Sequence, residues 1–165
     1  MKSIDPDKLK KGKEFEGKIL KYFKGKGWDA KLNIFYDEDG NETYQSILLE
    51  NGYSSYPDIE IQKEKDGITV RHLIEVKSLK RLFINGLFNV VVRAEQFEDY
   101  KEVQRFTKVP VHIAFIFYEE PFDIMEEWYM QSLDKLDATK KLVKDLYQVE
   151  DRHYIWQTTH LKRIK

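Results

Sequence analysis

Two short segments with the alternating pattern of β-strands constrain this chain most, because each one carries acidic residues. The first spans residues 56–61 and contains Asp58, and the second spans residues 73–77 and contains Glu75 and Lys77. Successive side chains of a strand point to opposite faces, so Glu75 and Lys77 share one face. A turn sequence, Lys-Asp-Gly, lies between the segments and predicts that they pair as a hairpin. A carboxylate from each strand then lies beside a lysine, and Mg²⁺ prefers one or two protein carboxylates, waters and phosphate oxygens.

A long helix is expected before these strands. Asp5 and Pro6 form a typical helix start, and the helix is expected to run to about residue 24, where Gly25 follows. On this helix Glu16 falls within the apolar stripe, where an unpaired carboxylate is costly. Glu14 falls on the opposite face among lysines, which predicts solvated i,i+4 pairs.

A second helix is expected over residues 94–106, followed by an apolar strand over residues 111–117. Gln96 and Tyr100 are one turn apart on this helix, so they can act together, and Arg93 falls on the same stripe.

The order of these elements resembles the PD-(D/E)xK nuclease superfamily, which includes restriction endonucleases, archaeal-type Holliday junction resolvases and RecB-type exonucleases. The resemblance covers roughly residues 6–118, and Gln96 and Tyr100 match the QxxxY motif of the RecB-type enzymes. It implies an α/β fold with a restriction endonuclease-like core. That core is a mixed central β-sheet flanked by helices, with an acidic residue on the N-terminal helix.

The resemblance also implies a role for each motif residue. Asp58 and Glu75 are expected to bind Mg²⁺, with the backbone carbonyl of Val76 as a third ligand. Glu16 is expected to bind the ion through water. Lys77 is expected to orient the attacking water or to offset charge in the transition state.

Five residues are expected to contact substrate near this site. Gln96 and Tyr100 would contact a phosphate or a base, although a plain position at the helix–sheet boundary is the alternative interpretation. Lys80 and Arg81 follow the second strand and can hold a DNA backbone close to the ion, and Arg93 shares the stripe of Gln96.

Composition limits the remaining possibilities. The 165 residues fit one domain, with a core at about 6–118 and a C-terminal extension over 119–165 that packs on or extends the sheet. A net charge of -1 argues against a histone-like binder, although ten lysines lie between residues 2 and 31. The absence of cysteine excludes disulfides and cysteine-held zinc or iron–sulfur centres. No apolar run is long enough to span a bilayer, so we expect a soluble, cytoplasmic protein.

Other segments carry weaker patterns. We expect a strand pair from residues 30–36 and 42–49, a polar loop at 51–56, a hairpin or lid at 82–92, and structural histidines at 72 and 112. In the tail we expect a strand at 128–136, a helix at 138–147 and a strand at 153–162.

These patterns predict a divalent-metal-dependent DNA nuclease that uses Mg²⁺, with Mn²⁺ as a substitute. The QxxxY match favours an exonuclease, whereas the small size favours a structure-specific endonuclease. The main alternative is an inactive nuclease-fold domain that binds nucleic acid or assembles with partners. A third possibility is an unrelated α/β protein, in which Asp58 and Glu75 would lie far apart. DNA is the expected partner, and a homo-oligomer or a partner protein is possible.

Overall fold

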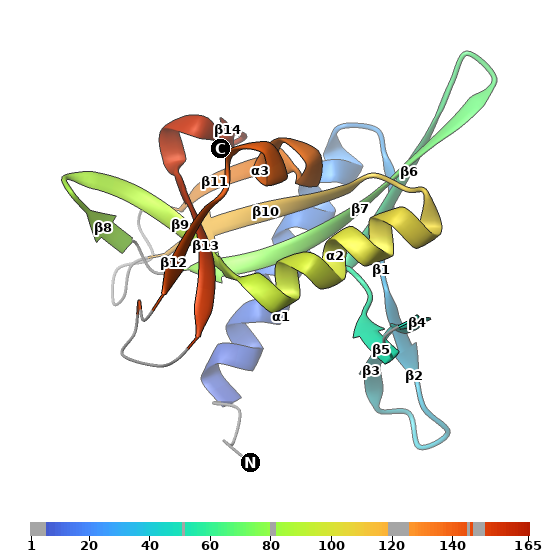
Figure 1. Ribbon diagram of the computed structural model, residues 1–165. Helices are drawn as coiled ribbons and strands as arrows, with labels where there is room; N and C mark the ends of the chain where they lie inside the picture. Colours follow the sequence, from blue (N-terminus) through green and yellow to red (C-terminus); the bar gives the residue numbers. More distant parts are fainter. Residues whose placement is uncertain (1–5, 51, 80–81, 119–125, 145, 147–150) are drawn as a thin grey trace.

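The computed structural model describes residues 6–50, 52–79, 82–118, 126–144, 146 and 151–165. Its helices are α1 (Pro6–Gly25), α2 (Ala94–Thr107), α3 (Leu133–Thr139) and the 3₁₀ turn η1 (Thr158–His160). Figure 1 shows α1 and α2 on either side of a long, twisted sheet.

The central sheet has six strands in the order β1-β6-β7-β10-β11-β14. β7 and β10 are parallel, and the other neighbouring pairs are antiparallel, so the sheet is mixed. These strands are β1 (Asp29–Leu32), β6 (Ile59–Lys65), β7 (Ile68–Leu79), β10 (Val111–Phe117), β11 (Glu127–Ser132) and β14 (Lys162–Arg163).

A second sheet and two separate hairpins complete the described strands. The second sheet has the order β12-β13-β9-β8, and β2–β3 and β4–β5 form two-stranded sheets of their own. The strands are β2 (Ile34–Tyr36), β3 (Glu42–Tyr44), β4 (Ser46–Leu49), β5 (Gly52–Ser55), β8 (Leu82–Ile84), β9 (Leu87–Arg93), β12 (Lys141–Lys144) and β13 (Arg152–Gln157).

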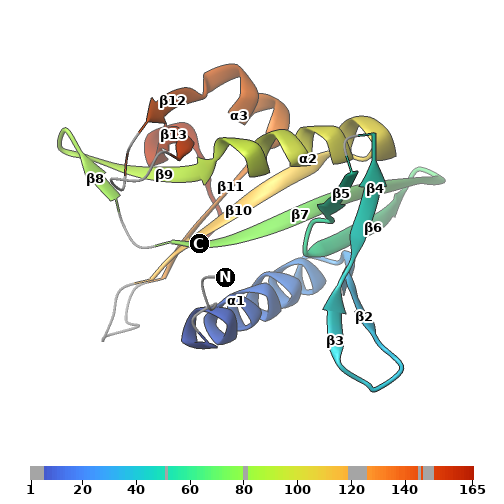
Figure 2. The same ribbon diagram turned by 60° about the horizontal axis from the view of Figure 1, so that its bottom comes forward.

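Helix α1 covers one face of the central sheet, as Figure 2 shows. Its buried residues Phe15 and Ile19 pack with strand residues that include Ile59 and Ile74. The helix ends as the glycines predict: the Gly27 amide donates to the Lys24 carbonyl, and the next amide reaches back to the Phe23 carbonyl. Gly27 has a φ of 78°, the left-handed conformation that this type of helix end requires.

Helix α2 covers the opposite face together with the second sheet. Its buried residues Phe97, Tyr100 and Val103 pack against strand residues such as Leu73 and Phe115. The two core clusters therefore lie on the two faces of β7, which matches the alternation of its side chains.

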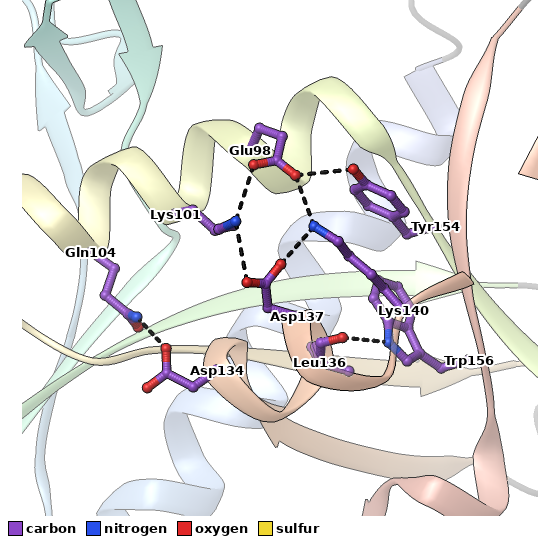
Figure 3. A network of polar contacts seen from close by, with 9 residues as sticks. All are labelled: Glu98, Lys101, Gln104, Asp134, Leu136, Asp137, Lys140, Tyr154 and Trp156. Atoms are coloured by element: carbon purple, nitrogen blue, oxygen red, sulfur yellow. Dashed lines mark hydrogen bonds and ion pairs between the residues drawn. The ribbon is translucent and has the colours of Figure 1, made fainter. Parts of the chain in front are cut away.

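A polar network ties α2 to the C-terminal part of the chain (Figure 3). The Lys140 ammonium lies 2.6 Å from an Asp137 carboxylate oxygen on α3 and 3.1 Å from a Glu98 oxygen on α2. The Tyr154 hydroxyl of β13 donates to the same Glu98 oxygen at 3.0 Å, and the Trp156 indole donates to the Leu136 carbonyl at 2.9 Å. These contacts fix the helix that carries Gln96 and Tyr100 relative to the second sheet.

Several sequence predictions are confirmed, among them α1, α2, β10 and the hairpin of β6 with β7. The segment 82–92 forms a hairpin, β8–β9, rather than a lid, because β9 also pairs with β13 and buries Val90–Val92. Asp5, the expected helix cap, lies outside the described residues.

Four predictions in the small hairpins and the tail differ from the structure in whole or in part. Residues 30–36 and 42–49 pair with each other only in part. Ile34–Tyr36 (β2) pairs with Glu42–Tyr44 (β3) as predicted, whereas β1 pairs with β6 and β4 pairs with β5. The polar segment 51–56 is therefore largely strand instead of loop. In the tail, the strand stops at Ser132 and the helix spans 133–139, since Leu133 and Leu136 are buried one turn apart. Residues 141–144, expected as helix, form an edge strand beside β13.

The two strand histidines contact each other. His112 Nε2 and His72 Nδ1 lie 3.0 Å apart on the parallel neighbours β10 and β7. Burial lowers the pKa of His112 to about 4, so this ring is neutral near neutral pH and the pair shares one hydrogen bond. No helix among the described residues is long and apolar enough to cross a membrane.

Candidate active site

The hairpin of β6 and β7 brings Asp58 and Glu75 together. Ile59 pairs with Ile74 in the antiparallel register, so Asp58, one residue before Ile59, lies opposite Glu75, one residue after Ile74. Asp58 Oδ2 accepts a hydrogen bond of 2.8 Å from the Val76 amide. This bond ties the first motif segment to the second, which excludes the unrelated fold in which the two acids would lie far apart.

Among the acids of the site, Glu75 accepts hydrogen bonds from the largest number of side chains. Its side chain is almost fully buried, and Oε1 accepts from Lys77 Nζ and from the Tyr100 hydroxyl, each at 2.6 Å. The Lys77 ammonium also lies 5.5 Å from the centre of the Tyr100 ring. Lys77 and Tyr100 therefore hold this carboxylate in one orientation.

Glu16 approaches from helix α1. It is 8% exposed, and both of its carboxylate oxygens lie 3.3–3.4 Å from the Tyr44 hydroxyl on β3. Glu14, one half-turn away, forms an exposed ion pair of 2.9 Å with Lys18 as predicted, so the two acids of this helix have different environments.

Burial and mutual repulsion raise the pKa values of two of these carboxyl groups, Asp58 and Glu16. Burial is the main cause that raises the pKa of Asp58 well above its usual value, and the charges of Glu75 and Glu16 add to it. The Val76 amide and Lys77 act in the opposite direction. Burial likewise raises the pKa of Glu16 to about 7, with Glu75 adding and the Tyr44 hydroxyl opposing. Acids that resist ionisation in this way gain most from a bound cation.

The donor set fits a hard divalent ion that takes part of its coordination from water. Within the described residues, no hydrogen bond engages Asp58 Oδ1 or Glu75 Oε2, which leaves one oxygen of each carboxylate available. No three histidine, cysteine, aspartate or glutamate side chains of the described part converge closely enough to hold an ion alone. Such an ion would need a backbone carbonyl such as that of Val76 and several waters, the coordination that Mg²⁺ prefers.

The expected substrate-binding residues differ in position. Tyr100 is 1% exposed and donates to Glu75, so its hydroxyl contacts a motif carboxylate. Gln96 is half-buried on α2, and its side chain makes no hydrogen bond within the described residues. Arg93 is exposed and forms an ion pair of 3.0 Å with Asp151. Lys80 and Arg81 lie outside the described residues.

Two contributors were not identified from the sequence, Asn33 and Tyr44. Asn33 is a buried amide whose side chain donates to the Pro57 carbonyl at 2.8 Å, and its backbone amide donates to the Asp58 carbonyl at 2.8 Å. The sequence gives no local signal, because Asn33 lies within the expected strand 30–36 and Tyr44 within the expected strand 42–49. The contacts themselves join residues far apart in the chain.

The overall architecture is the restriction endonuclease-like α/β fold that the motif order implies, and comparison with the solved structure of Hjc confirms it. Hjc, a Holliday junction resolvase from Archaeoglobus fulgidus, superposes with a TM-score of 0.53 at 15% sequence identity. The match covers 93% of this chain and 92% of Hjc. D212, a nuclease from a fusellovirus, matches with a TM-score of 0.48 at 15% identity over 94% of this chain and 86% of its own. No family model and no curated protein sequence matches the chain.

Proposed function

We propose that this protein is a divalent-metal-dependent nuclease that hydrolyses phosphodiester bonds of DNA. One observation carries the proposal: one buried polar site contains Glu16 together with the three motif residues Asp58, Glu75 and Lys77. The similarity of fold to a Holliday junction resolvase supports it.

Asp58, Glu75 and the Val76 carbonyl would hold Mg²⁺, with Glu16 acting through a water. When bound, the ion would polarise the scissile phosphate and lower the pKa of the attacking water. It would also favour ionisation of the carboxylates whose pKa values burial raises, because an adjacent positive charge stabilises their charged forms.

Lys77 places a positive charge directly beside the carboxylate of Glu75. Its side chain is 19% exposed and its ammonium is bonded to Glu75 Oε1, so its flexible stem is largely fixed. An ammonium held in this way can donate to the attacking water and offset charge that develops on the phosphate. Tyr100 would keep Glu75 oriented from the other side.

Between the two nuclease types, we propose a structure-specific endonuclease that acts on branched DNA. The support is the similarity to Hjc over 92% of that protein, whose described activity is Holliday junction resolution. The QxxxY pair supports exonuclease activity less, since Tyr100 is buried against Glu75 and not presented to solvent.

A cleavage assay tests the proposal. Single-stranded, duplex and four-way junction DNA, each labelled at one 5′ end, would be incubated with Mg²⁺, with Mn²⁺ or with EDTA. The proposal predicts metal-dependent cleavage of the junction to discrete internal products. A ladder of single nucleotides would indicate an exonuclease. No cleavage of any substrate by folded protein would support the binding or assembly alternative.

A further inference from the structure

The β2–β3 hairpin and its flanks, residues 33–45, form an arm beside the candidate active site. The arm extends away from the central sheet (Figure 2). β2 pairs with β3, and these two strands form a sheet separate from the others. Phe35 and Tyr36 on it are 57% and 65% exposed. A two-stranded hairpin is marginally stable by itself, so its anchoring contacts determine where it lies.

The first anchor is Asn33 at the start of the arm. Its side-chain amide donates to the Pro57 carbonyl and its backbone amide to the Asp58 carbonyl, both at 2.8 Å. The Asn33 carbonyl in turn accepts from the Gln45 amide at the other end of the arm, at 3.0 Å. This buried residue therefore fixes the backbone on both sides of the Pro57–Asp58 peptide bond.

The second anchor joins the end of the arm to helix α1. The Tyr44 hydroxyl donates to the Glu16 carboxylate, and Glu42 forms an ion pair with Lys13, three residues before Glu16. Within the described residues, every side-chain hydrogen bond or ion pair that leaves the arm goes to α1 or to Pro57.

The two anchors thus contact two different acids of one site. We propose that the arm is a positioning element of this nuclease site, in which Asn33 sets Asp58 and Tyr44 orients Glu16. The inference rests on the proposed function and adds two positioning residues to it. Neither residue belongs to the motif, and neither supplies a metal ligand in the proposed site.

The Tyr44 hydroxyl faces both carboxylate oxygens of Glu16. The hydroxyl lies almost equally far, 3.3 and 3.4 Å, from the two oxygens of Glu16. A donor shared by both oxygens restricts where the carboxylate group lies, and each oxygen can still accept from a water. Glu16 would need this freedom to bind the ion through water.

The chain offers a matched pair of variants for the test. Tyr44→Phe and Tyr36→Phe each remove one hydroxyl from the arm, but only the first loses a contact with the site. Steady-state cleavage of the preferred DNA would be measured over a range of substrate and Mg²⁺ concentrations. A contact of this type with an ionised group is worth about one order of magnitude in rate. We therefore expect Tyr44→Phe to lower kcat about tenfold, with KM within about twofold, and to raise the Mg²⁺ concentration that gives half-maximal rate.

Tyr36→Phe should leave kcat, KM and the Mg²⁺ requirement within about twofold of the wild type, by the same reasoning. Asn33→Ala should behave like Tyr44→Phe, provided that circular dichroism shows the folded protein at the assay temperature. Equal kinetics for Tyr44→Phe and Tyr36→Phe, in an active wild-type background, would overturn the inference and leave the proposed function standing. A folded wild-type protein that cleaves no DNA would overturn both.

Discussion

The hydrogen bond from Tyr100 to Glu75 links the stability of helix α2 to the chemistry of the site. The hydroxyl lies 2.6 Å from Glu75 Oε1, and Tyr100 is 1% exposed, so water cannot replace it easily. Tyr100→Phe removes the hydroxyl and keeps the ring, and therefore leaves the packing with Phe97 and Val103 in place.

The expected size follows from the type of bond. A hydrogen bond to a charged group contributes about 1.5–3 kcal/mol, and Glu75 keeps Lys77 as its second partner. We therefore expect Tyr100→Phe to lower the free energy of unfolding by about 2 kcal/mol at neutral pH. If the same amount is lost from the transition state, the cleavage rate falls about thirtyfold.

Tyr154→Phe is the control. The Tyr154 hydroxyl donates to Glu98 on α2 at 3.0 Å. This variant therefore also removes a hydrogen bond between a tyrosine and a carboxylate that involves α2, but Glu98 lies outside the site. Urea unfolding and single-turnover cleavage would be measured for both variants. Both should lose stability, and only Tyr100→Phe should lose rate.

Two results would refute this reasoning. If Tyr100→Phe cleaves DNA at the wild-type rate, the hydroxyl does not orient a catalytic carboxylate. If Tyr154→Phe loses as much rate as Tyr100→Phe, the effect comes from the packing of α2 and not from Glu75.

Three further predictions concern stability. Because burial raises the pKa of Glu16 from 4.5 to about 7, the folded protein binds more protons than the unfolded chain between these values. The contribution of Glu16 should therefore lower the stability of the metal-free protein as pH rises through this range. Glu16→Gln should make the melting temperature depend less steeply on pH, and an unchanged slope would contradict the raised pKa of Glu16. Gly27→Ala should cost about 1–2 kcal/mol in urea unfolding, since Gly27 has a φ of 78°, whereas Gly17→Ala within the helix should not destabilise the protein. Lys140→Met should cost about 1 kcal/mol by losing its partly exposed ion pairs, with no change in Mg²⁺ requirement; a changed requirement would show that the network acts on the site.

The motif hairpin could be predicted because residues close together in the chain specify it. The alternation around Glu75 and the turn sequence at residues 65–67 specify both strands and their connection, and β6 and β7 follow that pattern. Neighbouring residues also predicted the helix end at Gly25 and Gly27 and the apolar strand β10.

The errors arose where partners distant in the chain decide the structure. Residues 141–144 have helical spacing, but pairing with β13 makes them a strand. Asn33 and Tyr44 carry no local sign of a role, because each acquires one from a residue more than 20 positions away. Tyr100 was expected to contact substrate, and only the packing of α2 on β7 shows that its hydroxyl contacts Glu75.

The most direct test of the central claim is the single-turnover cleavage rate of Lys77→Ala beside that of Lys31→Ala. Lys77 is bonded to Glu75 inside the site, whereas Lys31 is 68% exposed on β1 and lies 3.8 Å from Glu60. The account predicts that Lys77→Ala stays folded and loses cleavage of the DNA that the wild type cuts with Mg²⁺, by at least about a hundredfold, while Lys31→Ala keeps it. Wild-type rates for a folded Lys77→Ala would contradict the claim that Asp58, Glu75 and Lys77 form a nuclease active site.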